Sequence, residues 1–164
     1  ITSRLVGSEM CIRDRYDGSS AEYIVQRGLV VDGIELELKG KVNDNLDVTF
    51  GYTSMDGKNG TKDAREIPET MYSMWANYEV NPKLGWAVGV MHQGESLIKD
   101  GGTQMLPDYT RVDAAVYLML SDDFRLQVNM ENLTDELYFP HSHSTHQVSV
   151  GRERNIRLSL TRNF

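Results

Sequence analysis

From residue 34 to the C-terminus, apolar side chains recur at every second position of the chain. In the segment 46–53 every even-numbered residue is apolar or aromatic, whereas Asp47, Thr49 and Thr53 lie between them. Because successive side chains of a strand point to opposite faces, this alternation predicts strands with one apolar and one polar face. It predicts seven of them, around residues 34–39, 46–53, 72–80, 84–91, 111–120, 124–131 and 156–164. With their flanks they reach about 10 to 15 residues, closer to the 9 to 11 of a tilted membrane strand than to the 5 to 6 of a soluble sheet.

The connections between these strands alternate strictly between short and long. The short ones are rich in turn residues and occupy 43–45, 81–83 and 121–123. The long ones occupy 56–66, 98–108 and 134–149. Short turns at one end and long loops at the other are typical of outer-membrane β-barrels. A soluble β-sandwich would show the same alternation along each strand, but it has no reason to segregate its loops in this way.

Five aromatic residues lie close to predicted strand ends: Tyr72, Tyr78, Trp86, Tyr109 and Phe124. An amphipathic ring in such a place suits the interface between membrane and water. We therefore expect these rings at the two rims of a barrel, although ordinary strand aromatics would show the same spacing.

The composition argues against some classes of protein, such as helical membrane proteins and nucleic-acid-binding proteins, but it does not identify the function. The chain of 164 residues is 40% hydrophobic and 25% charged, and polar residues or glycine interrupt every apolar run long before the roughly 18 to 20 residues of a membrane helix. Its formal net charge of −7 argues against a nucleic-acid partner, which usually meets a basic face. The single Cys11 makes no internal disulfide and shows no metal-ligand spacing with the histidines.

Residues 1–15 do not fit the strand pattern. The run at 8–15 has crowded charges, lacks the apolar stretch of a secretory signal and looks like the translation of a sequencing-library linker. We therefore expect two parts, a non-native segment at 1–15 and a β-barrel portion at 16–164. A native N-terminal strand or helix is the alternative for the first part.

Three segments resemble the closing strands of TonB-dependent outer-membrane receptors. They are 33–38 (Gly-Ile-Glu-Leu-Glu-Leu), 126–138 with its Glu-Asn-Leu-Thr-Asp-Glu-Leu-Tyr run, and 156–164. The resemblance covers about residues 28–164. In that family an Asn-Leu-x-Asp-x-x-Tyr segment, here Asn132 to Tyr138, ends the penultimate strand, and a terminal aromatic residue, here Phe164, is read by the outer-membrane assembly machinery. Arg162 departs from the pattern, because the family usually carries an aromatic or apolar residue there.

The resemblance implies an all-β fold, namely a fragment of about seven C-terminal strands from an antiparallel transmembrane β-barrel of 22 strands closed around a plug. An odd number of strands also argues for part of a barrel, because bacterial single-chain barrels have even counts. By the same resemblance the protein is a receptor of the bacterial outer membrane that takes up ferric siderophores, with the TonB complex acting through a missing N-terminal part. Lipid and lipopolysaccharide would surround it, and no resident cofactor is implied.

Two alternatives remain open at the level of sequence. Residues 21–27 would supply an eighth strand, making the chain a complete small outer-membrane barrel with an adhesive or structural role. A soluble β-sandwich binding module is the second. A plug domain encoded upstream would identify the receptor, whereas a signal peptide directly before residue 16 would identify the small barrel.

Candidate binding residues lie in or beside the long connections. They are the histidines His141, His143 and His146 and the arginines Arg65, Arg111, Arg152 and Arg154. Imidazoles at this spacing suit contact with an iron-loaded ligand, and a His-rich final loop resembles receptors for catecholate siderophores; a solvated polar loop and direct metal ligation are the alternatives. Guanidinium groups would attract an anionic ferric chelate, or else pair with lipopolysaccharide phosphates or neighbouring carboxylates. No catalytic triad, carboxylate pair or phosphate-binding loop can be assembled, so we expect no enzyme and no metal cofactor.

Overall fold

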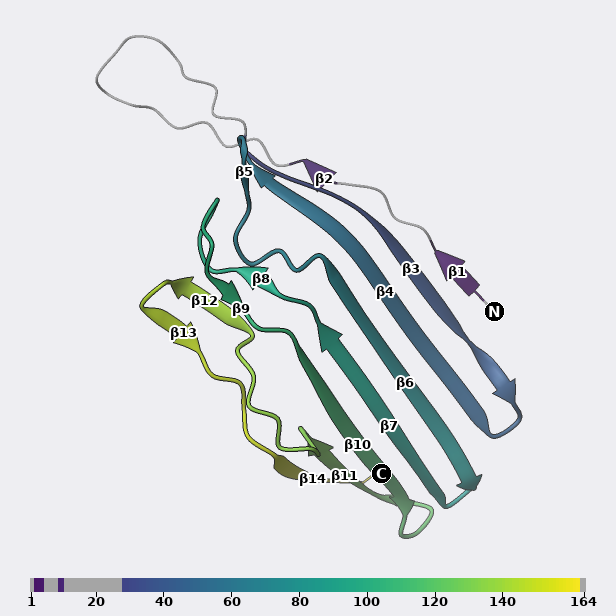
Figure 1. Ribbon diagram of the computed structural model, residues 1–164. Helices are drawn as coiled ribbons and strands as arrows, with labels where there is room; N and C mark the ends of the chain where they lie inside the picture. The colour runs from purple at the N-terminus through teal and green to yellow at the C-terminus, as the bar shows by residue number, and fades with distance from the viewer. Residues whose placement is uncertain (1, 5–8, 11–27, 163–164) are drawn as a thin grey trace.

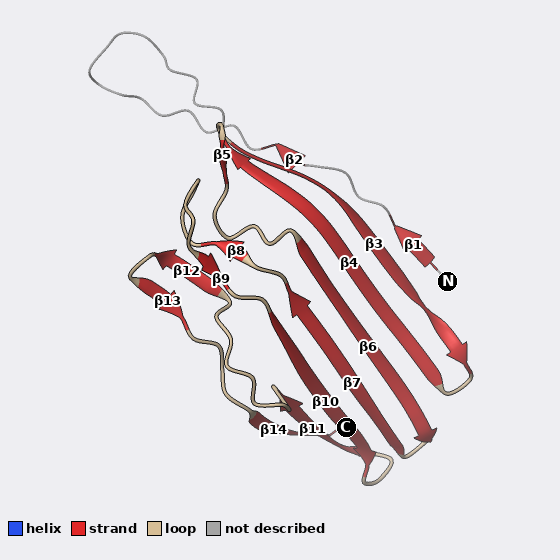
Figure 2. Cartoon of the chain, viewed as in Figure 1, coloured by secondary structure: helices blue, strands red, loops and turns tan. Residues whose placement is uncertain are grey.

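Seven long antiparallel strands, joined in chain order, form the main sheet of the protein (Figures 1 and 2). The computed structural model describes residues 2–4, 9–10 and 28–162. The long strands are β3 (Leu29–Asn43), β4 (Leu46–Asn59), β6 (Thr70–Asn81), β7 (Leu84–Gln93), β10 (Tyr109–Met119), β11 (Phe124–Glu131) and β14 (Asn155–Arg162). They confirm the all-β prediction and its strand count. The described residues include no helix long and apolar enough to span a membrane.

Short strands lie along the edge of this sheet and in its long connections. Its edge at β3 is paired with β1 (Thr2–Arg4) and β2 (Glu9–Met10), and β5 (Lys62–Asp63) pairs antiparallel with the outer end of β4. Two small hairpins stand apart, β8 (Ser96–Leu97) with β9 (Met105–Leu106) and β12 (His141–Ser144) with β13 (Gln147–Ser149). The expected division after residue 15 stays a prediction, and residues 21–27, the eighth strand of the small-barrel alternative, lie outside the described residues.

The long strands form one continuous sheet within the described chain. A β-sandwich needs two sheets packed face to face. The β-sandwich alternative is therefore wrong.

Register places the apolar residues of successive strands on a common face. Directly opposed residues form rows across the sheet, such as Leu38, Phe50, Met74, Val90 and Val112. The next row belongs to the other face and runs through Lys39, Thr49, Trp75, Gly89 and Asp113. The apolar face is open: Met74 keeps 44% of its surface exposed and Leu158 keeps 68%. The sequence therefore assigned both faces correctly.

The predicted alternation of connections is also confirmed, but the long ones have different bounds. Tight turns follow β3, β6 and β10, while the connections 60–69, 94–108 and 132–154 leave the opposite end of the sheet (Figure 1). The first begins later than expected, because β4 stays paired with β3 until Asn59 lies opposite Leu29. The second begins earlier because β7 ends at Gln93, and the third is longer because β11 and β14 have only 8 residues each.

Four of the five expected rim aromatics lie on the apolar face. Near its two ends, Tyr72 stacks on His92 with ring centroids 4.7 Å apart, and Tyr78 lies 5.4 Å from Trp86. The expectation for Tyr109 is wrong, since it pairs with Gln93 in the register of the polar face and is only 6% exposed. The guanidinium of Arg162, the residue that departs from the family pattern, lies 5.2 Å above the ring of Phe124.

Buried residues gather mainly at the loop end. The buried residues there include Ala64, Ser96, Leu106, Tyr109, Asn132, Tyr138 and Ser142. In the middle of the sheet, the buried residues among those described are Ala87, Gly89 and Ala115. The tightest packing of this chain therefore lies where its long connections meet.

Candidate functional site

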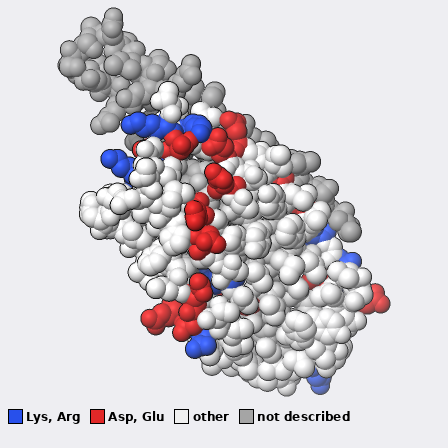
Figure 3. Space-filling model, in the orientation of Figure 1, with Lys and Arg blue, Asp and Glu red and all other residues white. Residues whose placement is uncertain are grey.

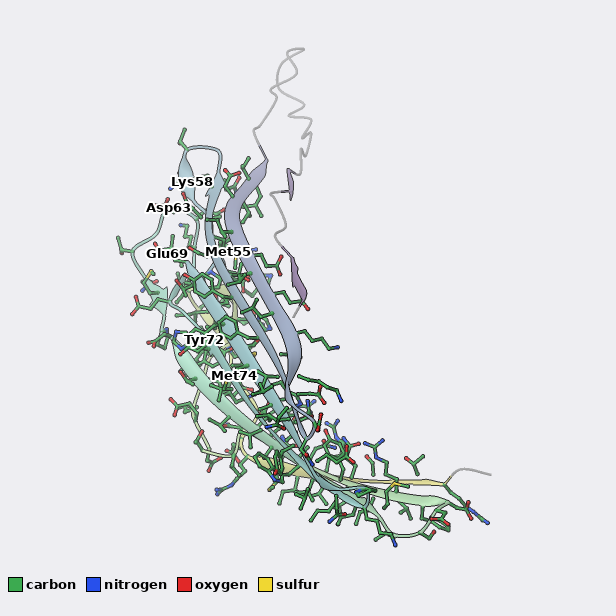
Figure 4. All side chains as sticks on the ribbon, turned by 90° about the vertical axis from the view of Figure 1, so that its right-hand side faces the viewer. Met55, Lys58, Asp63, Glu69, Tyr72 and Met74 are labelled. Carbon is green, nitrogen blue, oxygen red and sulfur yellow. The ribbon has the colours of Figure 1, made fainter. Side chains whose placement is uncertain are left out.

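The candidate site is the loop end of the sheet, where the three long connections contact one another. Basic and acidic side chains lie next to each other there, and acidic side chains continue in a band down the face shown in Figure 3. A hollow of about 660 Å³ opens between the outer part of β4, the start of β6 and the β8–β9 hairpin. Met55, Lys58, Asp63 and Glu69 line it and follow one another along β4, β5 and the approach to β6 (Figure 4).

The first two connections meet at Asp100. Its Oδ1 accepts a hydrogen bond of 2.8 Å from the backbone N–H of Arg65, and its Oδ2 accepts one of 2.7 Å from the Asn59 side chain. The Arg65 N–H, followed by the Asn59 amide, lowers the pKa of the Asp100 carboxyl below its usual range, against the opposing effect of partial burial. An ionised Asp100 therefore ties 60–69 to 94–108 at neutral pH.

A second link between these connections lies one residue further on. Glu66 has a positive φ of 58°, a conformation that is uncommon for residues other than glycine. Its backbone N–H donates to the carbonyl oxygen of Leu97 at 2.9 Å. The corner formed by Arg65 and Glu66 is therefore fixed from the neighbouring connection.

The third connection docks on the same corner through the β12–β13 hairpin. Glu66 Oε1 accepts a 2.8 Å hydrogen bond from the backbone N–H of Ser142, and Arg65 Nη1 donates to the carbonyl oxygen of His143 at 2.8 Å. Ser142 is only 2% exposed, whereas His141, His143 and His146 are exposed. The structure thus brings Arg65 and His143 together, through the backbone of the histidine.

The Asn132 to Tyr138 segment forms the base of this connection. Asn132 has a φ of 53° and is 1% exposed. Its Nδ2 donates to the carbonyl oxygens of Glu136 at 2.9 Å and Arg152 at 3.0 Å, while its Oδ1 accepts from the Glu136 N–H at 2.9 Å. One buried amide side chain therefore closes the turn and joins the two ends of the connection.

Asp135 holds the returning chain. Its φ is 59°, and its Oδ1 accepts a 2.9 Å hydrogen bond from the backbone N–H of Arg154. The Arg154 guanidinium lies 3.9 Å from Asp135 Oδ2 and donates to the carbonyl oxygen of Leu133 at 3.5 Å. Arg154 thus closes the base of the connection.

Tyr138 completes the segment by packing on the polar face of the sheet. Its ring centroid is 4.6 Å from that of Tyr109, and a β-carbon on Gly151 would lie 2.2 Å from its Cζ. Arg111 donates to the Tyr138 hydroxyl at 3.3 Å and pairs with Asp113 at 2.8 Å. The residues of the Asn-Leu-x-Asp-x-x-Tyr pattern therefore have a structural role, because their contacts hold β10, the end of β11 and the approach to β14 together.

The predicted binding residues consequently fall into two groups. The histidines present exposed side chains, and so does Arg152, whose carbonyl oxygen is held by Asn132. Arg65, Arg111 and Arg154 engage their guanidinium groups in the internal contacts described above. Whether any of the seven touches a ligand stays a prediction. Phe164, the expected assembly signal, lies outside the described residues.

Sequence reasoning missed Glu66, Asp100 and Asn59, the residues that join the connections. Their contacts span 76 positions for Glu66 and 41 for Asn59, and no spacing in the sequence signals them. Among the residues that the structure describes, no three His, Cys, Asp or Glu side chains converge as a metal site would require.

Comparison of the sequence with known proteins identifies a matching family and several relatives. Residues 12–133 match the family described as "TonB dependent receptor-like, beta-barrel". The probable TonB-dependent siderophore receptor PiuA of Acinetobacter baumannii is 28% identical over 149 residues, covering 79% of this chain and 20% of its own. The ferrioxamine receptor of Yersinia enterocolitica is 30% identical over 159 residues, covering 88% and 22%.

A solved structure agrees in fold. The crystal structure of PiuA from Acinetobacter baumannii superposes with a TM-score of 0.73 at 24% identity, covering 82% of this chain and 22% of that one. The chain thus spans about a fifth of the length of the curated relatives it matches. Over that span, the family match and the single antiparallel sheet agree, and the chain belongs to the TonB-dependent receptor-like β-barrel family.

Proposed function

We propose that this chain forms part of the wall and the outer loops of a receptor that takes up ferric siderophores with energy from the TonB complex. The observation that carries the proposal is the match, over most of this chain, to curated relatives named as siderophore and ferrioxamine receptors. The TonB complex would act on a segment of the receptor outside this chain. The role proposed here is binding and transport, with no catalytic step.

The apolar face supports a place in the outer membrane, where members of this family are β-barrels. Ile156, Leu158 and Leu160 each keep more than 60% of their surface exposed, at 65%, 68% and 62%. Such a continuous apolar surface is unfavourable in water and suits contact with lipid. On this proposal, lipid and lipopolysaccharide cover the apolar face, the three long connections face the exterior, and the tight turns face the periplasm.

Uptake by the complete receptor tests this function. The full-length gene is expressed in a strain that lacks its own siderophore receptors, and cells are supplied with iron-55 as ferrioxamine B or as a ferric catecholate. We expect uptake of at least one complex, lost when TonB is deleted. No uptake of either complex at normal receptor abundance, or uptake that persists without TonB, would contradict the proposal.

Within this receptor we propose that His141, His143 and His146 contact the ligand, with Arg152 adding positive charge. Their exposed side chains on a docked hairpin support this role. Replacing the three histidines with alanine should leave the amount of receptor in the outer membrane unchanged, because exposed loop side chains contribute little to stability. Uptake of the accepted complex should fall; unchanged uptake at equal abundance would favour a solvated loop without a binding role. His92→Ala, outside the hairpin, is the matched control.

A further inference from the structure

The histidine-bearing hairpin is held by two consecutive residues of a distant connection. The Ser142 N–H donates to Glu66 Oε1, and the His143 carbonyl oxygen accepts from Arg65 Nη1, each at 2.8 Å. These partners lie 76 and 78 positions apart in the chain. The hairpin is therefore positioned from outside itself as well as through its own two strands.

The Arg65 contact falls at an irregularity of the hairpin. Ser142 pairs with Val148 and Ser144 pairs with Gln147, so His143 is the extra residue of a β-bulge. The extra residue of a bulge loses its cross-strand partner, and the bulge changes the direction of nearby side chains. Arg65 supplies the partner that the His143 carbonyl lacks within the hairpin, which stabilises the bulge.

The Glu66 contact fixes which side of the hairpin faces outward. Ser142 is 2% exposed and lies against the first connection, whereas His141 and His143, on either side of it in sequence, are exposed. Alternate residues of a strand point to opposite faces. Binding the Ser142 backbone at Glu66 therefore keeps the neighbouring imidazoles on the open side.

The two anchoring residues are themselves held in place by the second connection. The Arg65 N–H donates to Asp100 and the Glu66 N–H donates to Leu97, at 2.8 and 2.9 Å. Glu66 also keeps its positive φ of 58°, which persists only where the surroundings hold it. The corner is therefore a rigid support for the hairpin.

We infer that Arg65 and Glu66 are positioning residues that orient the His141, His143 and His146 hairpin for ligand contact. The ligand part of this inference rests on the proposed receptor function, whereas the docking of the hairpin does not. A hairpin that is already ordered loses less conformational freedom when it binds, so docking should increase affinity.

Hairpin mobility in the complete receptor tests the docking. A spin label is attached at Thr145→Cys in a background with other cysteines replaced, and its motion is recorded by electron paramagnetic resonance. Glu66→Gly removes the carboxylate while tolerating the positive φ, so it isolates the side chain from the backbone. Loss of a hydrogen bond to a charged group should raise the detached population of the hairpin about tenfold.

A conservative variant of Glu66 and a control at another carboxylate show whether the mobility of the hairpin depends on the hydrogen bond of the Glu66 side chain. Glu66→Gln keeps the Oε1 acceptor for the Ser142 N–H but makes it neutral and therefore weaker, so the mobility of its label should lie between wild type and Glu66→Gly and closer to wild type. Glu95→Gly removes an exposed carboxylate of the second connection that is not hydrogen-bonded to the hairpin among the described residues, and should leave the label unchanged. An unchanged label in Glu66→Gly, or equal mobility in Glu66→Gln and Glu66→Gly, would overturn the inference.

Affinity for ferrioxamine B supplies the second readout. In Glu66→Gly and Arg65→Gln we expect weaker binding at unchanged receptor abundance, with Glu66→Gln close to wild type. If affinity and abundance fall together, Glu66 is only structural and the inference is wrong. If the wild-type receptor does not bind ferrioxamine B, that ligand assignment fails, and label mobility alone decides whether Arg65 and Glu66 position the hairpin.

Discussion

The indole ring of Trp75 lies against Gly89, its direct partner on the neighbouring strand. A β-carbon built on Gly89 would come within 1.9 Å of Trp75 Cε3, closer than any real contact. The ring also donates a 3.0 Å hydrogen bond from its Nε1 to Asn77 Oδ1. Glycine is therefore required at position 89 by a close cross-strand approach on the polar face of the sheet.

Replacing Gly89 with alanine should destabilise the receptor by about 1 to 3 kcal/mol, because the added methyl group forces the large Trp75 ring out of its place. Urea-dependent unfolding of the full-length receptor in lipid vesicles measures the change in free energy of unfolding.

Gly51→Ala is the control for this variant. Gly51 lies on the same face and pairs with Ser73, and its β-carbon would be 3.3 Å from Ser73 Oγ, a distance that small shifts relieve. Gly51→Ala should lower the free energy of unfolding much less than Gly89→Ala does. The double variant Trp75→Leu/Gly89→Ala should recover part of the loss. Wild-type stability of Gly89→Ala would show that the ring does not occupy this position.

The assignment of the two faces is tested by neighbouring residues of β6. Met74 and Ser73 are both exposed but belong to opposite faces. Met74→Arg should cost about 2 to 4 kcal/mol if it faces lipid near the middle of the bilayer, and Ser73→Arg should cost much less. The same vesicle unfolding measurement compares them. Equal costs would mean that the apolar face of this sheet does not meet lipid.

These examples show which parts of the structure the sequence could predict. A strand has a period of two, and a shift of one residue would move every side chain to the other face, so the alternation along 72–80 alone predicts opposite faces for Met74 and Trp75. The contact between Ser142 and Glu66 cannot be predicted from the sequence, because it depends on the paths of two loops and on a positive φ at a glutamate. Asn132 and Asp135 carried a readable signal, since Asn and Asp tolerate the left-handed conformation, but their partners Arg152 and Arg154 depend on tertiary structure.

Asn132 should be the most sensitive residue of the third connection. Asn132→Ala removes the three hydrogen bonds of a buried side chain, so the backbone groups of Glu136 and Arg152 lose these partners, which should cost about 2 to 3 kcal/mol. The loss should be local, so limited proteolysis of intact cells should cleave the connection 132–154 faster than in the wild type.

Asn129→Ala provides the comparison for the Asn132 variant. Asn129 lies on β11, the strand that ends just before Asn132, and its side chain accepts one 2.8 Å hydrogen bond from Gln127. Its replacement should leave the cleavage rate nearly unchanged. Equal cleavage of the Asn132→Ala and Asn129→Ala receptors would show that Asn132 does not fasten the connection.

The junction at Asp100 should respond to acid. The Arg65 N–H and the Asn59 amide favour the charged carboxylate, so the pKa of Asp100 in the folded protein lies below its value in the unfolded chain, about 3.9. A group with a lowered folded pKa contributes stability above its unfolded pKa, and that contribution is lost as the pH falls through the folded pKa. The contribution of Asp100 to the stability of this junction should therefore stay constant between about pH 5 and pH 8. Below about pH 4 the junction should loosen.

A fluorescent label at Lys99→Cys, beside Asp100 in the second connection, reports this loosening as a fall in anisotropy of the full-length receptor. Asp100→Asn is the matched variant, because it keeps the Oδ1 acceptor for the Arg65 N–H but cannot change its charge. Its label should show a weaker junction at neutral pH, since a neutral acceptor makes a weaker hydrogen bond than a carboxylate. The Asp100→Asn receptor should also lose the acid transition that is expected for the parent receptor. If the parent and Asp100→Asn receptors loosen together below about pH 4, other carboxylates control the transition and Asp100 does not.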